Sequence, residues 1–182
     1  MKLSKKISTF LVCSVFLLAI CYPLFTKASP PPMTTYYATD WDIPSGRGDH
    51  YSGNLYSSKY DDSNYLIARA DWTWFIFWIF WADIEFEFPN VLADVITVEV
   101  RDNVIRNNML VTVYYTSGNP ETFPKNAGEW DNGWLSDGTY TFEVDDSRTV
   151  DWVKVIFWHT GGWGDKYLKV DMIKLIDYNI PF

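Results

Sequence analysis

Cysteine is almost absent from this sequence of 182 residues, and its two copies, Cys13 and Cys21, both lie in the N-terminal leader. The rest of the chain can therefore form no disulfide and no thiolate metal site. Histidine is equally scarce, with only His50 and His159, and neither stands in a metal-binding spacing. The sequence also lacks a Gly-x-Ser-x-Gly nucleophile motif and a phosphate-binding glycine loop. These absences argue against an enzyme.

Basic side chains are also few. The chain has 15 Lys and Arg residues, and removal of the leader with its four lysines leaves 11 against 23 acidic residues, a net charge of −12. Such a chain is repelled by phosphate backbones and by anionic membrane surfaces, so nucleic acid is not an expected partner. With 23 acids, some carboxylate pair will always match the spacing of a glycosidase. A cryptic hydrolase therefore remains only as a third, weaker alternative.

Residues 1–28 have the pattern of a secretory signal. Lysines precede an apolar run, Phe10–Phe25, and Thr26-Lys27-Ala28 offers small residues for cleavage after Ala28. An uncleaved anchor helix is an alternative because the run approaches membrane-spanning length. Lipidation at Cys21 is a weaker one, because Ile20 stands where a small residue is wanted. Each alternative puts the rest of the chain outside the cytoplasm, secreted or anchored to a membrane only by its N-terminus.

The rest of the chain has the pattern of one all-β domain. After a proline-rich spacer at 29–33, residues 34–182 show short alternating runs separated by turn residues, and no sustained helical period. About eight strands and their turns predict an antiparallel β-sandwich of jelly-roll type. The expected strands are 34–38, 64–70, 83–88, 94–101, 109–116, 139–144, 150–159 and 167–176.

The segment Trp72–Trp81, "WTWFIFWIFW", is too short to cross a membrane as a helix. As one strand from 72 to 88 it would span about 55 Å, too long for a sandwich, so it must bend, bulge or leave the sheet. Three interpretations stay open: a central strand covered on its second face by the N-terminal loop, a contact surface, or an aggregation-prone segment shielded by assembly. The tryptophans assigned to an assembly contact are Trp72, Trp74, Trp78 and Trp81.

Several strings resemble exported domains of the galactose-binding-domain-like jelly-roll fold. "SGRGDHYSGNLYSSKYDDSNYLIARA" (Ser45–Ala70) is similar to an early element of that fold, with its glycines, Asp61-Asp62 and Tyr65-Leu66. Ile96–Phe123 resembles the paired central strands, and Val150–Leu175 resembles the last two. The resemblance implies a carbohydrate-binding-module-like domain that recognises ligands through loops at one end, often with calcium nearby. The discoidin subtype is not matched, because its terminal cysteine pair is missing.

Two loops combine tryptophan with small and polar residues, the mixture that stacks on sugars and satisfies their hydroxyls. "GEWDNGW" contains Trp130, Asp131, Asn132 and Trp134. "HTGGWGDK" contains Trp163 and Asp165. These residues are the candidate ligand-binding site. The alternative is that the tryptophans close the ends of the core, since tryptophan is usually largely buried.

A calcium site could use the hard carboxylate oxygens of Asp40, Asp61, Asp62 and Asp171. No EF-hand spacing is present, so this assignment rests on acid density and on the fold resemblance. Surface acids that are simply solvated are the alternative.

The sequence thus predicts a secreted or cell-surface, non-catalytic domain that binds carbohydrate or a surface glycan through loop aromatics. The alternative is a structural, self-associating extracellular protein that packs through Trp72–Trp81 or adds an N-terminal strand to a neighbour.

Overall fold

The computed structural model describes residues 32–60, 62–75, 77–104, 108–125, 135–161 and 164–179, and between 72 and 78 only the path of the backbone. No helix among these residues is long and apolar enough to cross a membrane. The predicted leader and most of the predicted spacer lie outside the described residues.

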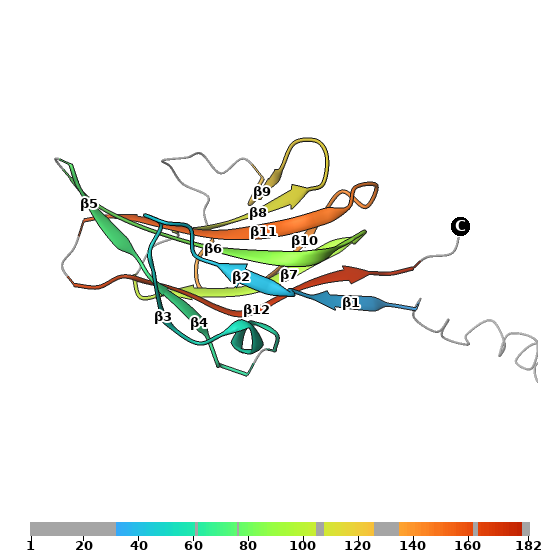
Figure 1. The fold of residues 1–182 in the computed structure, drawn as a ribbon, viewed down its shortest axis with the longest axis horizontal. Coiled ribbons are helices and arrows are strands. Elements are labelled where there is room, and N and C mark those ends of the chain that lie inside the picture. Colours follow the sequence, from blue (N-terminus) through green and yellow to red (C-terminus); the bar gives the residue numbers. More distant parts are fainter. Residues whose placement is uncertain are drawn as a thin grey trace, which may run out of the picture. The chain divides into compact units, whose positions relative to one another are not determined.

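Two antiparallel sheets form a β-sandwich, as the alternating sequence predicts (Figure 1). In spatial order, sheet A consists of β10 (Gly138–Glu143), β7 (Val95–Asp102), β12 (Tyr167–Asp177), β4 (Leu66–Arg69) and β3 (Asp49–Ser52), with β1 (Thr34–Tyr37) also paired to β12. Sheet B consists of β2 (Asp40–Asp42), β6 (Phe77–Val91), β11 (Val150–Thr160), β8 (Met109–Tyr115) and β9 (Glu121–Phe123), with β5 (Asp71–Phe75) paired to β6.

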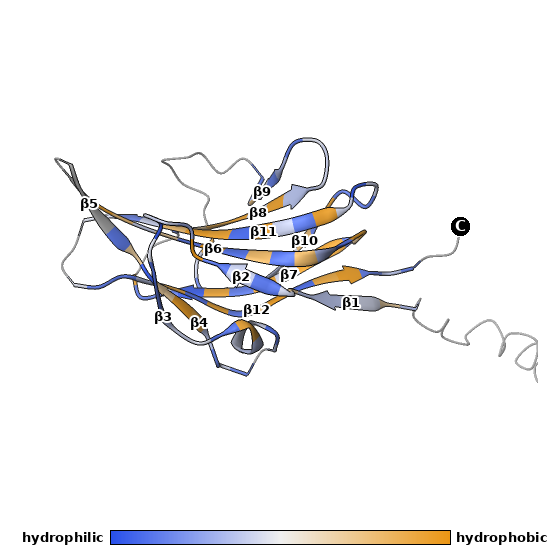
Figure 2. Ribbon diagram, in the orientation of Figure 1, coloured by the Kyte–Doolittle hydropathy of each residue, from blue (hydrophilic) through white to orange (hydrophobic). Residues whose placement is uncertain are grey.

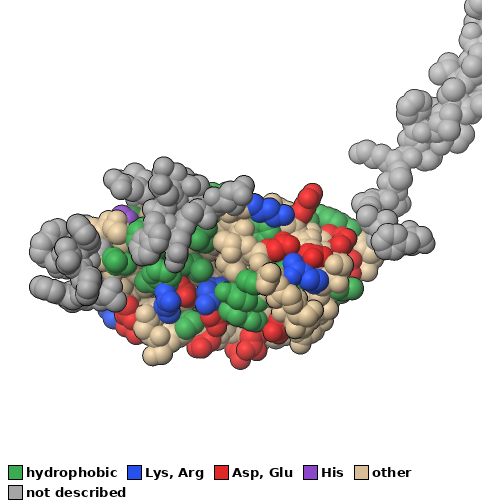
Figure 3. Space-filling model, turned by 90° about the horizontal axis from the view of Figure 1, so that it is seen from above, with side chains coloured by type: hydrophobic (Ala, Val, Ile, Leu, Met, Phe, Trp, Pro, Cys, Tyr) green, Lys and Arg blue, Asp and Glu red, His purple; other side chains and the backbone are tan. Residues whose placement is uncertain are grey.

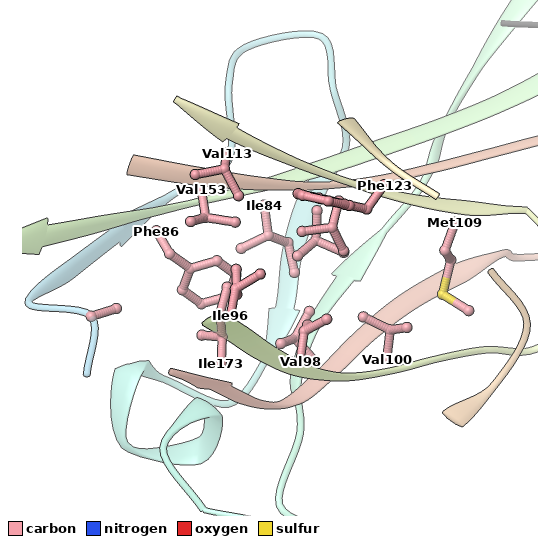
Figure 4. Close-up of a cluster of buried hydrophobic side chains, with 14 of the residues drawn as sticks. Ile84, Phe86, Ile96, Val98, Val100, Met109, Val113, Phe123, Val153 and Ile173 are labelled. Atoms are coloured by element: carbon pink, nitrogen blue, oxygen red, sulfur yellow. The ribbon is translucent and has the colours of Figure 1, made fainter. Parts of the chain in front are cut away.

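The core lies between the sheets and follows the period of two. Ile84 and Phe86 of β6 are fully buried, and so are Val98 and Ile173 of the facing sheet. Figure 4 shows these side chains pointing toward one another, and Figure 2 shows hydrophobic and hydrophilic positions alternating along β11. Burying such aliphatic and aromatic side chains contributes about 1.5–3 kcal/mol each. This core stabilises the domain without the disulfides that the sequence excludes.

The aromatic segment Trp72–Trp81 reverses direction. Strands β5 and β6 pair antiparallel, with Asp71 opposite Trp81 and Phe75 opposite Phe77. The segment is therefore a β-hairpin at the start of β6, which agrees with the prediction that it cannot run on as one strand. At the start of β6 the buried positions alternate in phase with the rest of the strand, since Phe80 and Ala82 continue the buried position of Ile84.

Short elements are the part of the fold that the sequence pattern did not predict. They are β2, β3, β5, β9 and a 3-10 helix, η2 (Leu55–Ser58). Asn54 caps η2, because its side chain accepts hydrogen bonds from the N–H groups of Tyr56 and Ser57. Gly53 precedes this cap with a positive φ, and a Cβ there would lie 2.2 Å from the carbonyl oxygen of Tyr65. Only glycine allows the chain this close to β4.

The N-terminal strand pairs within its own chain. Thr34 lies opposite Asp177 and Tyr37 opposite Lys174 of β12. The side-chain amide of Asn179 donates a hydrogen bond to the Thr34 hydroxyl at 2.7 Å. This bond joins the segment after β12 to the start of β1. Residues 34–37 are thus used inside the domain, and strand addition to a neighbour would require them to leave it.

Candidate functional site

The outer surface of sheet B carries tryptophans beside charged side chains. The outward residues of β6, β11 and β8 alternate with buried ones. The strand register places Trp158 opposite Trp81 and Trp152 opposite Tyr114. We call the aromatic face the set of outward side chains here together with the arginine that covers one of them: Arg47, Trp81, Asp83, Tyr114, Trp152, Lys154 and Trp158.

At one end of the aromatic face, Arg47, Trp81 and Asp83 form a compact unit. The Arg47 guanidinium lies over the Trp81 ring at 4.3 Å from its centroid, a cation–π contact. The Trp81 indole Nε1–H donates to Asp83 Oδ1 at 2.5 Å. The Asp83 backbone N–H donates to the Arg47 carbonyl at 2.8 Å, so the loop that carries Arg47 is attached to β6. Trp81 is therefore held by contacts to its edge and to one face.

Lys154 joins this unit to the other end of the face. Its ammonium lies 2.7 Å from Glu85 Oε1 and 3.7 Å from Asp83 Oδ2. The same ammonium lies 5.2 Å from the Trp152 ring centroid. Trp152 stacks on Tyr114 with the centroids 3.5 Å apart and the planes 6° from parallel. Along β11 the six residue steps from Trp152 to Trp158 span about 20 Å.

Asp83 is a buried carboxylate on the outside of a sheet, with 2% of its surface exposed. Burial raises the pKa of Asp83, while the Trp81 hydrogen bond and the charges of Lys154 and Arg47 oppose that rise and Glu85 adds to it. Burying a carboxylate costs free energy unless it gains partners, so an acid that only kept the sheet soluble would be exposed to water. Buried Asp83 is therefore better suited to orient its neighbours than to solubilise the sheet.

The aromatic face offers indole surface, a half-exposed guanidinium and hydrogen-bonding oxygens within one rigid sheet. Such a combination suits a ligand with both apolar and hydroxyl-bearing faces. In Figure 3, Lys and Arg side chains lie among hydrophobic and acidic ones rather than in a separate basic patch. This distribution favours an uncharged ligand over a polyanion.

Most of the predicted loop site, namely Trp130, Asp131, Asn132, Trp134 and Trp163, lies outside the described residues. The described ends of the two loops have separate partners. Leu135 bonds to Asn108, and the Asp165 carbonyl accepts from the Asn103 side chain at 2.8 Å.

Asn108 also contacts the aromatic face. The Trp158 backbone N–H donates to the Asn108 carbonyl at 3.0 Å. Both predicted loops therefore start or end beside one end of the aromatic face, one at His159 after Trp158 and the other at Leu135.

Asp165 is the one predicted ligand-binding residue that the structure describes. It is exposed, and its carboxylate accepts a hydrogen bond from the Tyr167 hydroxyl at 3.2 Å. Its carbonyl is the acceptor for Asn103. In this structure Asp165 supports the turn between β11 and β12.

The predicted calcium ligands are only partly brought together. Asp171 sits at the irregularity of β12 with no exposed surface, and its Oδ2 accepts from the Ser63 N–H at 2.9 Å. Asp62 lies close enough for its charge to act on Asp171. Asp61 lies outside the described residues. Asp40 belongs to β2 in the other sheet, where it bonds to its neighbour Trp41, so it does not join this group.

The surroundings of Asp171 suit a hard cation in part. Asp171 Oδ1 and Glu99 Oε2 are both buried and have no hydrogen-bond partner among the described residues. Burial raises the pKa of Asp171, the nearby carboxylates Glu99 and Asp62 raise it further, and backbone N–H groups of Ser63 and Asp62 oppose the rise. Across the described part of the chain, no three acid or histidine side chains cluster tightly enough to hold a metal by themselves.

The predicted assembly contact is described only through Trp81, which is partly exposed and covered on one face by Arg47. Arg47 comes from the N-terminal loop, so the interpretation of a strand covered by that loop holds at this residue. Trp72, Trp74 and Trp78 lie in β5 and β6, and their side chains are outside the described set. Self-association stays a prediction.

Trp81 is the one residue of the aromatic face that the sequence singled out, whereas Arg47, Asp83, Tyr114, Trp152, Lys154 and Trp158 were not among its candidates. By strand alternation alone, Asp83 shares the outward face of β6 with Glu85 and Glu87. A signal was available in Lys154, a charged residue in an otherwise apolar run, but its partner follows only from strand pairing.

No known protein family model and no curated protein matches this chain. Solved structures with a similar course of the chain include a low-affinity xylan-binding module from Roseburia intestinalis, 10% identical over 80% of this chain and 93% of that one, with a TM-score of 0.43. Another is a family 29 carbohydrate-binding module from Piromyces equi, 19% identical over 81% and 91%, with a TM-score of 0.37.

A family two carbohydrate esterase from Cellvibrio japonicus is also similar, at 12% identity and a TM-score of 0.34 over 80% of this chain and 34% of that one. These neighbours include carbohydrate-binding modules, the class that the sequence resemblance named. At such TM-scores the fold assignment depends on the two sheets described above, and the choice of ligand depends on this chain's own residues. The expectation that the chain is not an enzyme stays a prediction.

Proposed function

We propose that this chain is a secreted or cell-surface, non-catalytic domain that binds an uncharged carbohydrate through the aromatic face. The observation that carries the proposal is Trp81, kept partly exposed on the outside of a sheet while Arg47 and Asp83 fix its ring. Sugar rings stack on indoles, and adjacent charged groups bond to their hydroxyls.

The charge of the surroundings favours a neutral glycan. Glu85 and Glu87 follow Asp83 along β6, and Asp40 and Asp42 of β2 lie opposite them. A polymer that carries carboxylates or sulfates would meet repulsion from these side chains. The loops with Trp130, Trp134 and Trp163 would extend the same site, because their described ends adjoin Trp158.

Binding should be tested with intact protein against a panel of soluble neutral and acidic polysaccharides, by titration calorimetry and by iodide quenching of tryptophan. Neutral glycans should protect tryptophan, and Trp81→Ala should remove that protection. Tyr51→Ala, which removes an exposed aromatic ring from β3 of sheet A, is the matched control and should bind normally. Protection that depends on protein concentration and ignores glycans would instead support self-association.

We also propose that Asp171 and Asp62, with Glu99 nearby, hold a calcium ion that stabilises the domain. The unpartnered, buried oxygens of Asp171 and Glu99 support this assignment. Calcium should raise the melting temperature of the wild type relative to chelator-treated protein, and Asp171→Asn should abolish that increase. An equal melting temperature with calcium and with chelator would contradict the proposal.

A further inference from the structure

Asp83 contacts three groups of the aromatic face, Trp81, Lys154 and Arg47. Its Oδ1 accepts from the Trp81 indole at 2.5 Å, and its Oδ2 lies 3.7 Å from the Lys154 ammonium and 4.0 Å from Arg47 Nε. A carboxylate can accept from several donors at once, whereas a neutral apolar residue at this position would release all three.

The geometry points to Asp83 as the positioning residue of the ligand-binding surface, which sets the orientation of Trp81 and draws Arg47 and Lys154 over the indoles. This inference rests on the proposed function, which it deepens. Asp83 is 98% buried by the atoms around it, so its carboxylate acts on a ligand through these neighbours rather than by contact.

The arrangement also connects the two ends of the face. Lys154 bonds to Glu85 and approaches Asp83, and its ammonium lies over Trp152, while Arg47 lies over Trp81. Asp83 thus attracts both cations that lie over indoles, Arg47 over Trp81 and Lys154 over Trp152. Loss of the Asp83 charge leaves Lys154 only Glu85, and leaves Arg47 without its anionic partner on β6.

Protonation of Asp83 should have a related effect. The charged groups that face Asp83 are Lys154 from β11, Arg47 from the 43–48 loop and Glu85 from β6 itself. Because burial shifts its titration upward, Asp83 should take up a proton under milder acid than an exposed aspartate. Protonated Asp83 still accepts from Trp81 but no longer attracts the two cations, so ligand binding should weaken as the pH falls.

The test uses the full chain and three variants, Asp83→Asn, Asp83→Ala and Trp81→Phe. Trp81→Phe assigns the Trp81 indole N–H resonance in a nitrogen–proton correlation spectrum. In wild type this resonance should lie at the hydrogen-bonded, downfield side and should move with pH. Asp83→Asn should keep the downfield position without the pH dependence, and Asp83→Ala should lose both.

Binding of the best neutral polysaccharide should fall about tenfold or more in Asp83→Ala and by only about threefold in Asp83→Asn, since the amide oxygen keeps the indole bond. An unchanged Trp81 resonance in Asp83→Ala, or equal losses of binding in both variants, would overturn the inference. If no polysaccharide binds wild type, the proposed function fails, yet the resonance still decides whether Asp83 positions Trp81. If Asp83→Ala does not fold, the pH titrations of wild type and Asp83→Asn decide it.

Discussion

The outer surfaces of the two sheets differ although both cover the same core. On the central strands β7 and β12 of sheet A, the outward residues include Thr97, Glu99, Arg101, Tyr167, Lys169 and Lys174. The corresponding surface of sheet B has three tryptophans, Trp81, Trp152 and Trp158. Both surfaces hold a buried acid, Glu99 on sheet A and Asp83 on sheet B. The two surfaces therefore differ in the kind of aromatic residue that they present, phenol rings on sheet A and indole rings on sheet B.

The largest expected effect is the loss of glycan binding when a tryptophan of sheet B is removed. Trp81→Ala should weaken glycan binding by about tenfold to a hundredfold, since a stacking ring and its cation partner are lost. The melting temperature should change little because the ring is partly exposed. Calorimetric titration beside Tyr51→Ala, which removes an exposed ring from sheet A, measures the contrast, and equal binding by both variants would remove it.

The next prediction concerns Asp102, a buried acid in β7 of sheet A. This residue should affect the pH dependence of stability without affecting glycan binding. Burial raises the pKa of Asp102 to about 6, the Val104 N–H and the Asn108 side chain oppose this rise, and Asp137 adds to it. The folded state therefore holds the proton more tightly than the unfolded chain does. This contribution should make the domain more stable as the pH falls from above 6 to about 4, by at most about 3 kcal/mol.

Asp102→Asn should flatten this dependence and raise stability at pH 7, as urea unfolding at several pH values would show. Glycan binding in wild type should instead fall as the pH falls, because of Asp83. Parallel changes of stability and binding with pH would argue that one group causes both.

A smaller effect is expected at the opposite end of the sandwich. Arg148 bonds to Asp145 at 2.6 Å and to the Asn119 carbonyl at 2.7 Å, and it lies over the Tyr115 ring. Arg148→Met should lower the free energy of unfolding modestly, because these charge-assisted bonds join two turns. Binding should remain normal, since none of these groups belongs to the aromatic face. A weakened affinity in this variant would count against the location of the site.

The smallest effect is expected for Lys154→Met. The methionine keeps the aliphatic packing on Trp152 but loses the ammonium, so affinity should fall by only about threefold to tenfold. Lys169→Met, on the outer surface of sheet A, is the matched control. Quenching of tryptophan with and without glycan would compare the two variants.

The long strands could be read from the sequence because their inner positions are uniformly aliphatic or aromatic. β7, β8, β11 and β12 lie within one or two residues of the expected ranges. The hairpin of β5 and β6 could not be located, because apolar residues fill both halves of Trp72–Trp81 and leave no turn signal. Asp83 looked like a solvent-facing residue, since a period of two gives a side chain its direction but not what lies over it.

The place of the proposed site followed less directly from the sequence than the strands did. Aromatic residues near glycine suggested sugar binding, and the described ends of those loops do meet one end of the aromatic face. The assignment of Trp81 to an assembly contact reflected only its apolar neighbours. Its relation to Arg47 and Asp83 depends on a contact between the 43–48 loop and β6 that no local pattern encodes.

The pairing of β1 with the end of β12 has a consequence for how the domain is attached. Thr34 and Asp177 are neighbours, and the length of β12 separates them by about 30 Å from Tyr167 at its other end (Figure 1). Whatever is joined before Pro32 or after Asn179 therefore connects at a single corner. The loop end beside Trp158 stays remote from that corner, so the domain can be tethered, fused or inserted into a larger protein without obstructing its approach to a polymer.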